Sequence, residues 1–123
     1  MFNPRAGAIC LVFMAVLAGA ARADDAMGAW TRDDGAVKIE FSPCGSAICG
    51  AVVWLKNPKA VAKVGQRVFF DMTRSDQITW IGKAFNPEDG RTYAGKMVLS
   101  GKKLKTSGCV LGGLICKTVL WMR

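Results

Sequence analysis

The chain has 123 residues, of which 17 are basic, 9 are acidic and none is histidine. A chain of this length folds as one compact domain and is too short to divide into two. The lack of histidine disfavours zinc sites and histidine-dependent nucleophilic catalysis.

Residues 1–23 have the pattern of a cleaved export signal. Arg5 precedes an uncharged apolar run over residues 6–20. This run is shorter than the ~20 residues that a membrane-spanning helix requires. It is followed by Ala21-Arg22-Ala23, a small-x-small triplet of the kind that signal peptidase cleaves. The pattern therefore predicts removal of the segment after Ala23.

The remaining residues, 24–123, are expected to form a single exported domain. Cys10 lies within the apolar run and not at the cleavage point, which disfavours a lipid-anchored form. Loss of the two arginines in the signal lowers the net charge from +8 to +6. Outside the cytoplasm such a surface favours anionic lipid headgroups or envelope polymers over nucleic acid as charged partners.

From Trp30 onward, short β-branched and aromatic runs alternate with glycine-containing turns, at the spacing typical of sandwiches and barrels. In the second run Val37, Ile39 and Phe41 alternate with polar residues, which predicts a half-buried strand. No helix is expected. Eight strands are expected, over residues 28–32, 36–42, 47–55, 67–73, 78–85, 91–99, 102–109 and 114–123.

Most connections between these runs are short, and the longest is a basic loop that ends at Gly65. The strongest turn signal is Asn86-Pro87-Glu88-Asp89-Gly90, in which proline and glycine adopt turn dihedrals at little steric cost. Short connections favour antiparallel neighbours, and closing a meander into a barrel removes its exposed edges. The sequence therefore predicts an all-β, eight-stranded antiparallel up-and-down barrel in which the strands containing Gly28 and Trp121 pair.

Four cysteines remain after cleavage, and an even number in a small exported domain indicates disulfides. Of the three pairings that four thiols allow, Cys44 with Cys49 and Cys109 with Cys116 are favoured because each pair brackets a turn signal. A two-residue turn at Gly112-Gly113 would place Cys109 opposite Cys116. The same count around Ser46-Ala47 would oppose Cys44 and Cys49. We expect two local structural disulfides.

The two ends of the domain carry a joint pattern. Gly28-Ala29-Trp30 and Arg123 resemble a lipocalin-like arrangement in which an arginine of the last strand covers the indole. Further motifs are Pro43-Cys44-Gly45, Cys49-Gly50, Val53-Trp54-Leu55, the block from Asn86 to Gly95, Gly108-Cys109 and the segment from Thr118 to Arg123. With these motifs the chain resembles a family of exported bacterial proteins called domain of unknown function 2147. The resemblance implies a lipocalin-like barrel closed by Gly28, Trp30 and Arg123, with no established activity and no catalytic residues.

Aromatic residues are the first candidates for a ligand site, because they suit both cores and pockets. The candidates for lining or seam positions are Trp30, Trp54, Trp80, Tyr93 and Trp121. An eight-stranded barrel is just wide enough to be filled by its own side chains or to hold one small ligand. The short strands favour an interior that is filled or holds only a very small cavity.

Charged residues give a second set of candidates. Lys56, Lys59, Lys63 and Arg67 cluster around the long loop, where solvated charge is the default. At a barrel mouth, Lys56, Lys63 and Arg67 could bind a carboxylate or phosphate headgroup whose tail enters the barrel. Asp33-Asp34 and Glu88-Asp89 fall in predicted turns, so we assign them to turn formation and not to acid–base catalysis.

These observations predict a non-enzymatic periplasmic or secreted protein. Without histidine, a free thiol or a Gly-x-Ser-x-Gly elbow, we expect no nucleophilic catalysis, no cofactor and no metal. The leading hypothesis is a barrel that binds a small hydrophobic or anionic amphipathic ligand. The alternative is a packed barrel whose outer surface binds an envelope protein or an anionic membrane surface. A nucleic-acid partner is not expected.

Overall fold

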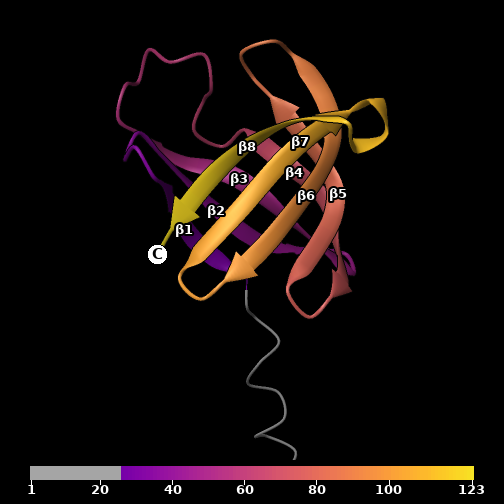
Figure 1. The fold of residues 1–123 in the computed structure, drawn as a ribbon. Coiled ribbons are helices and arrows are strands. Elements are labelled where there is room, and N and C mark those ends of the chain that lie inside the picture. The colour runs from indigo at the N-terminus through magenta and orange to yellow at the C-terminus, as the bar shows by residue number, and fades with distance from the viewer. Residues whose placement is uncertain (1–25) are drawn as a thin grey trace, which may run out of the picture.

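The computed structural model describes residues 26–123, so the predicted signal over residues 1–23 lies outside the described residues. Eight antiparallel strands form a closed barrel in chain order, and β8 pairs with β1 (Figure 1). The strands are β1 (Gly28–Arg32), β2 (Val37–Cys44), β3 (Ala47–Leu55), β4 (Arg67–Asp76), β5 (Thr79–Asn86), β6 (Arg91–Ser100), β7 (Lys103–Val110) and β8 (Ile115–Met122). The predicted up-and-down barrel is confirmed.

Because successive strands alternate in direction, the connections alternate between the two ends of the barrel (Figure 1). The mouth is formed by four connections, over residues 33–36, 56–66, 87–90 and 111–114. The closed end carries the other three turns together with Gly28 and Arg123. No helix in the described residues is long and apolar enough to span a membrane.

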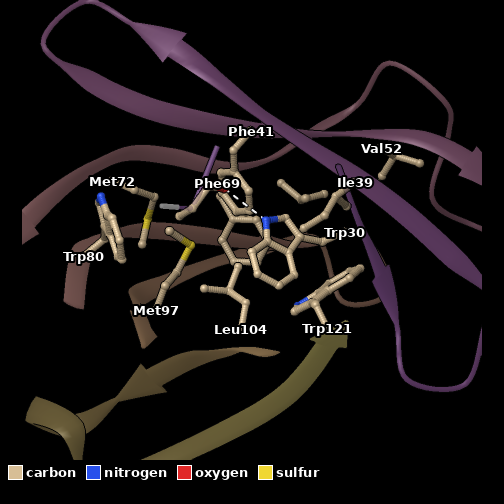
Figure 2. Packing of buried hydrophobic residues seen from close by; sticks show 12 residues of the cluster. Trp30, Ile39, Phe41, Val52, Phe69, Met72, Trp80, Met97, Leu104 and Trp121 are labelled. Carbon is tan, nitrogen blue, oxygen red and sulfur yellow. Dashed lines mark hydrogen bonds between the residues drawn. The ribbon is translucent and has the colours of Figure 1, made fainter. Parts of the chain in front are cut away.

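Large apolar side chains pack against one another inside the barrel (Figure 2), and most of the largest come from the parts of their strands next to the closed end. They point inward because alternate residues of a strand face one side of the sheet. The largest of them, all buried, are Trp30, Ile39, Phe41, Met72, Met97 and Leu104. The indole Nε1 of Trp30 donates a hydrogen bond to the carbonyl oxygen of Ala26, 3.0 Å away, so its polar atom is satisfied.

The seam between β1 and β8 is the shortest pairing of the barrel. It contains two register pairs, Thr31 with Met122 and Arg32 with Trp121. Arg123 reinforces it, because its guanidinium carbon lies 4.1 Å from the centroid of the Trp30 ring. The Arg123 Nη1 also donates a hydrogen bond to the Met27 carbonyl oxygen, 3.0 Å away. The covered indole that the family resemblance implied is therefore present.

Two disulfides lie at opposite ends of the barrel. The mouth disulfide joins Cys109 and Cys116, and these residues are directly opposed in the β7–β8 ladder, as predicted. The turn beyond it is longer than predicted: it is a 3₁₀ turn over Leu111–Gly113, and it is not confined to Gly112-Gly113.

The closed-end disulfide joins Cys44 and Cys49, with a Cα–Cα distance of 5.8 Å. The predicted register was wrong here, because Cys44 opposes Ala47 and Cys49 opposes Ser42. The turn is centred one residue earlier, since Gly45 takes the positive φ of 70° that favours glycine. The cysteines are therefore diagonal neighbours across the ladder.

Candidate functional site

A cavity of about 600 Å³ occupies the half of the barrel next to the mouth. The prediction of a filled or very small interior was wrong. The volume lies within the ~300–1,000 Å³ typical of small-molecule sites. Its apolar wall is formed mainly by Val37, Ile39, Val52, Leu55, Val68, Phe69 and Val119.

The cavity exists because inward positions near the mouth carry small side chains. Ala84 of β5 and Gly108 of β7 both line it. A Cβ added to Gly108 would lie 3.2 Å from the Cβ of Tyr93, so this wall has little room for a larger residue. The bulky side chains are concentrated below, next to the closed end (Figure 2).

Two buried residues, Thr106 and Trp121, form the polar part of the cavity lining next to the core. The Trp121 Nε1 donates a hydrogen bond to the Thr106 Oγ1 at 2.9 Å. The Thr106 hydroxyl in turn donates to the Val119 carbonyl oxygen at 3.4 Å. Because these polar groups satisfy one another, this part of the cavity can face an apolar molecule.

Lys117 is a cation on the inner face of the barrel wall. Lys117 faces the same side of β8 as Ile115, Val119 and Trp121, because these are every second residue of the strand. All four residues line the cavity. Lys117 stands opposite Gly108, which has no side chain to block it. Within residues 26–123, Lys117 forms no ion pair, since the single ion pair there joins other residues. The mouth thus presents an inward-facing cation above an aliphatic wall.

Two of the four carboxylates around the mouth, Asp34 and Asp89, are engaged by neighbouring groups. Asp34 accepts two hydrogen bonds from the Arg32 guanidinium, both at 2.9 Å, and one from the Ala36 amide. These contacts, the Arg32 bond above all, lower the pKa of Asp34 to about 2. The same pairing raises the pKa of Arg32, which lines the cavity.

Asp89 is held in a similar way in the β5–β6 turn. It accepts hydrogen bonds from the Tyr93 hydroxyl and, at 2.9 Å, from the Arg91 amide. The bond with Tyr93 lowers the pKa of the Asp89 carboxyl and raises the pKa of the phenol. The side chain thus stabilises its turn, as the sequence predicted.

Comparison with known proteins bears on the whole barrel. The family described as an uncharacterized protein conserved in bacteria, DUF2147, matches residues 28–123. The chain belongs to the DUF2147 family. Among solved structures, the Helicobacter pylori protein HP1028, described as belonging to the lipocalin family, is similar with a TM-score of 0.66 and 18% identity. The match covers 80% of this chain and 82% of that chain, and at this identity it shows the lipocalin-like fold. No curated protein matches the sequence.

In this DUF2147 barrel the five aromatic candidates separate into three groups. Tyr93 and Trp121 line the cavity. Trp30 and Trp80 are buried in the core below it and do not line it. Trp54 is 42% exposed and lies outside the lining, with the Lys38 Nζ 5.3 Å from its ring centroid.

A β-bulge explains the position of Trp54. The β2–β3 register shifts between Lys38 and Ile39, whose partners are Trp54 and Val52, so Val53 is an extra residue. An extra residue reverses the alternation of inward and outward side chains. Val52 and Leu55 consequently line the cavity, and the tryptophan between them does not.

The basic candidates of the DUF2147 protein lie beside the mouth but outside the cavity lining. Lys56, Lys63 and Arg67 are exposed and do not line the cavity. The Lys63 Nζ donates a hydrogen bond to the carbonyl oxygen of Ala60 in its own loop. That loop reaches the cavity through Ala60, Val61 and Ala62 instead. The predicted loop therefore lies at the mouth, and the side chains by which it lines the cavity are apolar.

Among the cavity-lining residues, Arg32, Arg91, Thr106 and Lys117 were not candidates from the sequence. The signal for Lys117 was available, because it has the same alternating phase as Val119 and Trp121. Thr106 could have been found in the same way from its phase with Leu104. The two arginines also have the phase of inward residues, Arg32 that of Trp30 and Arg91 that of Tyr93, so alternation indicates their direction as well.

Proposed function

We propose that this protein binds a small amphipathic molecule, with its apolar body in the cavity and its anionic head beside Lys117, and does not transform it. The observation that carries the proposal is an open cavity of about 600 Å³ whose aliphatic wall ends at an inward-facing lysine. The lipocalin-like fold supports it, because barrels of this size hold one small ligand.

The chemistry of the wall favours an apolar ligand body. The side chains are mainly valine, isoleucine and leucine, with the Trp121 ring next to the core. Burying a ligand against them removes apolar surface from water, at about 25 cal/mol per Å². The hydroxyls of Thr106 and Tyr93 are already committed to hydrogen bonds, so they offer neither a free nucleophile nor a reason to expect turnover.

The charge at the mouth favours an anionic head. Lys117 and Arg91 both line the opening, whereas the nearby Asp89 is engaged by Tyr93. Glu88 is exposed on the same turn and is the acidic group most able to oppose such a head. An anionic head next to β8 lies close to Lys117, whose charge also helps to lower the pKa of Asp89.

We place this activity outside the cytoplasm, in the periplasm or the medium. The support is the pair of disulfides, which persist in oxidising compartments, together with the signal predicted for residues 1–23. A test is secretion of an epitope-tagged full chain, with N-terminal sequencing of the exported product. We expect a mature chain that starts after Ala23.

The cavity is tested with matched tryptophan substitutions on one strand. Val119→Trp fills the cavity, whereas Leu120→Trp adds the same ring at the neighbouring outward position opposite Lys105. We expect the first variant to abolish binding of an anionic fluorescent fatty-acid analogue and the second to retain it. Lys117→Glu should weaken that analogue about tenfold or more and affect an uncharged analogue little.

Native mass spectrometry of protein purified from the periplasm identifies the natural ligand. We expect one molecule of an amphipathic anion per barrel. Equal probe binding by the Val119→Trp and Leu120→Trp variants, with no co-purified molecule, would show that the cavity is not a binding site.

A further inference from the structure

Two groups of exposed apolar side chains stand on opposite sides of the mouth. One is the tip of the β7–β8 hairpin, where Leu111 is 68% and Leu114 is 84% exposed. The other is the 56–66 loop, where Val61 and Val64 are 62% and 63% exposed. The β3–β4 and β7–β8 connections are four strands apart in a ring of eight, so they face each other across the opening (Figure 1). Exposed apolar clusters of this kind mark interaction sites.

The hairpin tip holds the exposed Leu111 in a backbone conformation that leucine rarely adopts. Leu111 has a φ of 55°, in the left-handed region that suits glycine or asparagine. The Leu114 amide donates to the Leu111 carbonyl oxygen, and the mouth disulfide closes the hairpin directly below. Strain that is maintained by surrounding structure is typical of functional segments. The turn thus presents an exposed leucine, Leu111, at a position whose backbone conformation disfavours it.

The charges beside these side chains identify the partner. The 56–66 loop contains Lys56, Lys59 and Lys63 and no acidic residue. Cations next to exposed aliphatic side chains match an anionic lipid surface, where the chains enter the interface and the ammonium groups meet the headgroups.

Four acidic residues, Asp33, Asp34, Glu88 and Asp89, also lie at the mouth. They lie on the two short hairpin connections, 33–36 and 87–90, which alternate with the apolar ones around the rim. Asp34 is bound by Arg32, and Asp89 is bound by Tyr93. Asp33 and Glu88 remain exposed, so the connection whose charge suits an anionic surface is the 56–66 loop, which carries three lysines and no acidic residue.

We propose that the mouth of the barrel docks onto an anionic lipid bilayer, with the β7–β8 tip and the 56–66 loop entering the interface. Docked in this way, the cavity opens directly onto the lipid, so an amphipathic molecule passes between bilayer and barrel without crossing water. The docking goes beyond the proposed ligand binding and does not depend on it, because vesicle binding is measured without a ligand.

The first test is flotation of the disulfide-bonded protein with phosphatidylcholine vesicles, with and without about 30% phosphatidylglycerol. The test variant is Leu114→Asp, and the control is Ile78→Asp, which changes a residue that is 50% exposed in the β4–β5 turn of the closed end. We expect Leu114→Asp to weaken binding to the anionic vesicles about tenfold or more, and Ile78→Asp to change it less than twofold.

The second test separates docking from the general attraction of a basic protein to anionic lipid. Lys56→Glu with Lys59→Glu reverses two charges at the mouth, and Lys102→Glu with Lys103→Glu reverses two at the β6–β7 turn of the closed end. The net charge changes equally in both double variants. We expect the mouth variant to lose binding and the closed-end variant to retain most of it.

Three outcomes would overturn the proposal. They are no binding to anionic vesicles, equal loss in the mouth and closed-end variants, or a dimer that becomes a monomer on Leu114→Asp. The last outcome, read by sedimentation velocity, would show that a second copy covers the tip. Near-ultraviolet circular dichroism checks that each variant is folded, and binding of the fatty-acid analogue remains a separate readout of the cavity.

Discussion

Arg123 closes the barrel at its shortest seam, and its removal should be unusually costly for an exposed side chain. Its cation–π contact with Trp30 is worth about 0.5 to 2 kcal/mol. Its hydrogen bond to the Met27 carbonyl oxygen, made by a charged donor at an exposed site, adds about 1 kcal/mol. We therefore expect Arg123→Ala to lower the free energy of unfolding by about 2 kcal/mol. For a domain of this size that is a fall of roughly 8 to 16 °C in Tm.

Arg74 supplies a matched control within a single hairpin. Its guanidinium carbon lies 4.5 Å from the Trp80 ring centroid, and its Nη1 donates to the Gln77 carbonyl oxygen at 2.8 Å. The β4–β5 ladder already holds these partners together, whereas β1 and β8 share two register pairs. We expect Arg74→Ala to cost less than half as much as Arg123→Ala in thermal and urea unfolding with the disulfides intact.

A double-mutant cycle with Trp30→Phe isolates the contact between the arginine and the indole. We expect a coupling energy of about 0.5 to 1 kcal/mol between Arg123→Ala and Trp30→Phe. Additive effects, or an equal cost for Arg74→Ala, would refute the view that Arg123 acts as the lock of the seam.

Three further predictions concern the rim, the cavity lining next to the core and the disulfides. The single tyrosine, Tyr93, should titrate by absorbance above its ordinary pKa of 10.0, because its hydroxyl donates to Asp89, and Asp89→Asn should lower that midpoint. The same bond lowers the pKa of the Asp89 carboxyl. Wild type should therefore have a higher free energy of unfolding than Tyr93→Phe at neutral pH, and this difference should shrink as the pH falls through the lowered pKa. Thr106→Val should lower the free energy of unfolding in urea by about 1 to 3 kcal/mol, because it leaves the buried Trp121 N–H without its acceptor. Unchanged stability would show that the N–H has another acceptor. Replacing both cysteines of the mouth disulfide by serine should lower the free energy of unfolding by about 2.5 kcal/mol and weaken vesicle binding. The same replacement at the closed-end disulfide should lower the free energy of unfolding by a similar amount and leave vesicle binding intact.

The strand order and the barrel could be predicted because their signals are local. Alternation at Val37, Ile39 and Phe41 marks a strand, and the Asn86 to Gly90 turn marks a tight connection. Eight such strands joined by short connections have few arrangements other than a closed meander. The β7–β8 register was predictable as well, since the opposed cysteines fix it independently of the turn.

The cavity could not be predicted, because its volume depends on how side chains of distant strands share one interior. The short strands indicated a filled interior, and Trp54 was a candidate for its lining. Trp54 instead faces outward after a bulge that no local pattern predicts. Ala84 and Gly108 look unremarkable in the sequence and matter only because both point to the same side of the barrel. Local periodicity predicts the direction of a single side chain, whereas the volume of the cavity depends on all the inward side chains together.

The even number of strands has a practical consequence for handling the molecule. Gly28 and Arg123 lie at the same end, and Arg123 contacts the backbone just before β1 through the Met27 carbonyl oxygen. A short linker between these two ends would give a circular permutant, with new termini opened in the 56–66 loop. In the unpermuted chain, a surface tether or fusion partner attached at either end would leave the opening of the barrel accessible, so immobilised protein could be used directly to capture molecules from a cell extract.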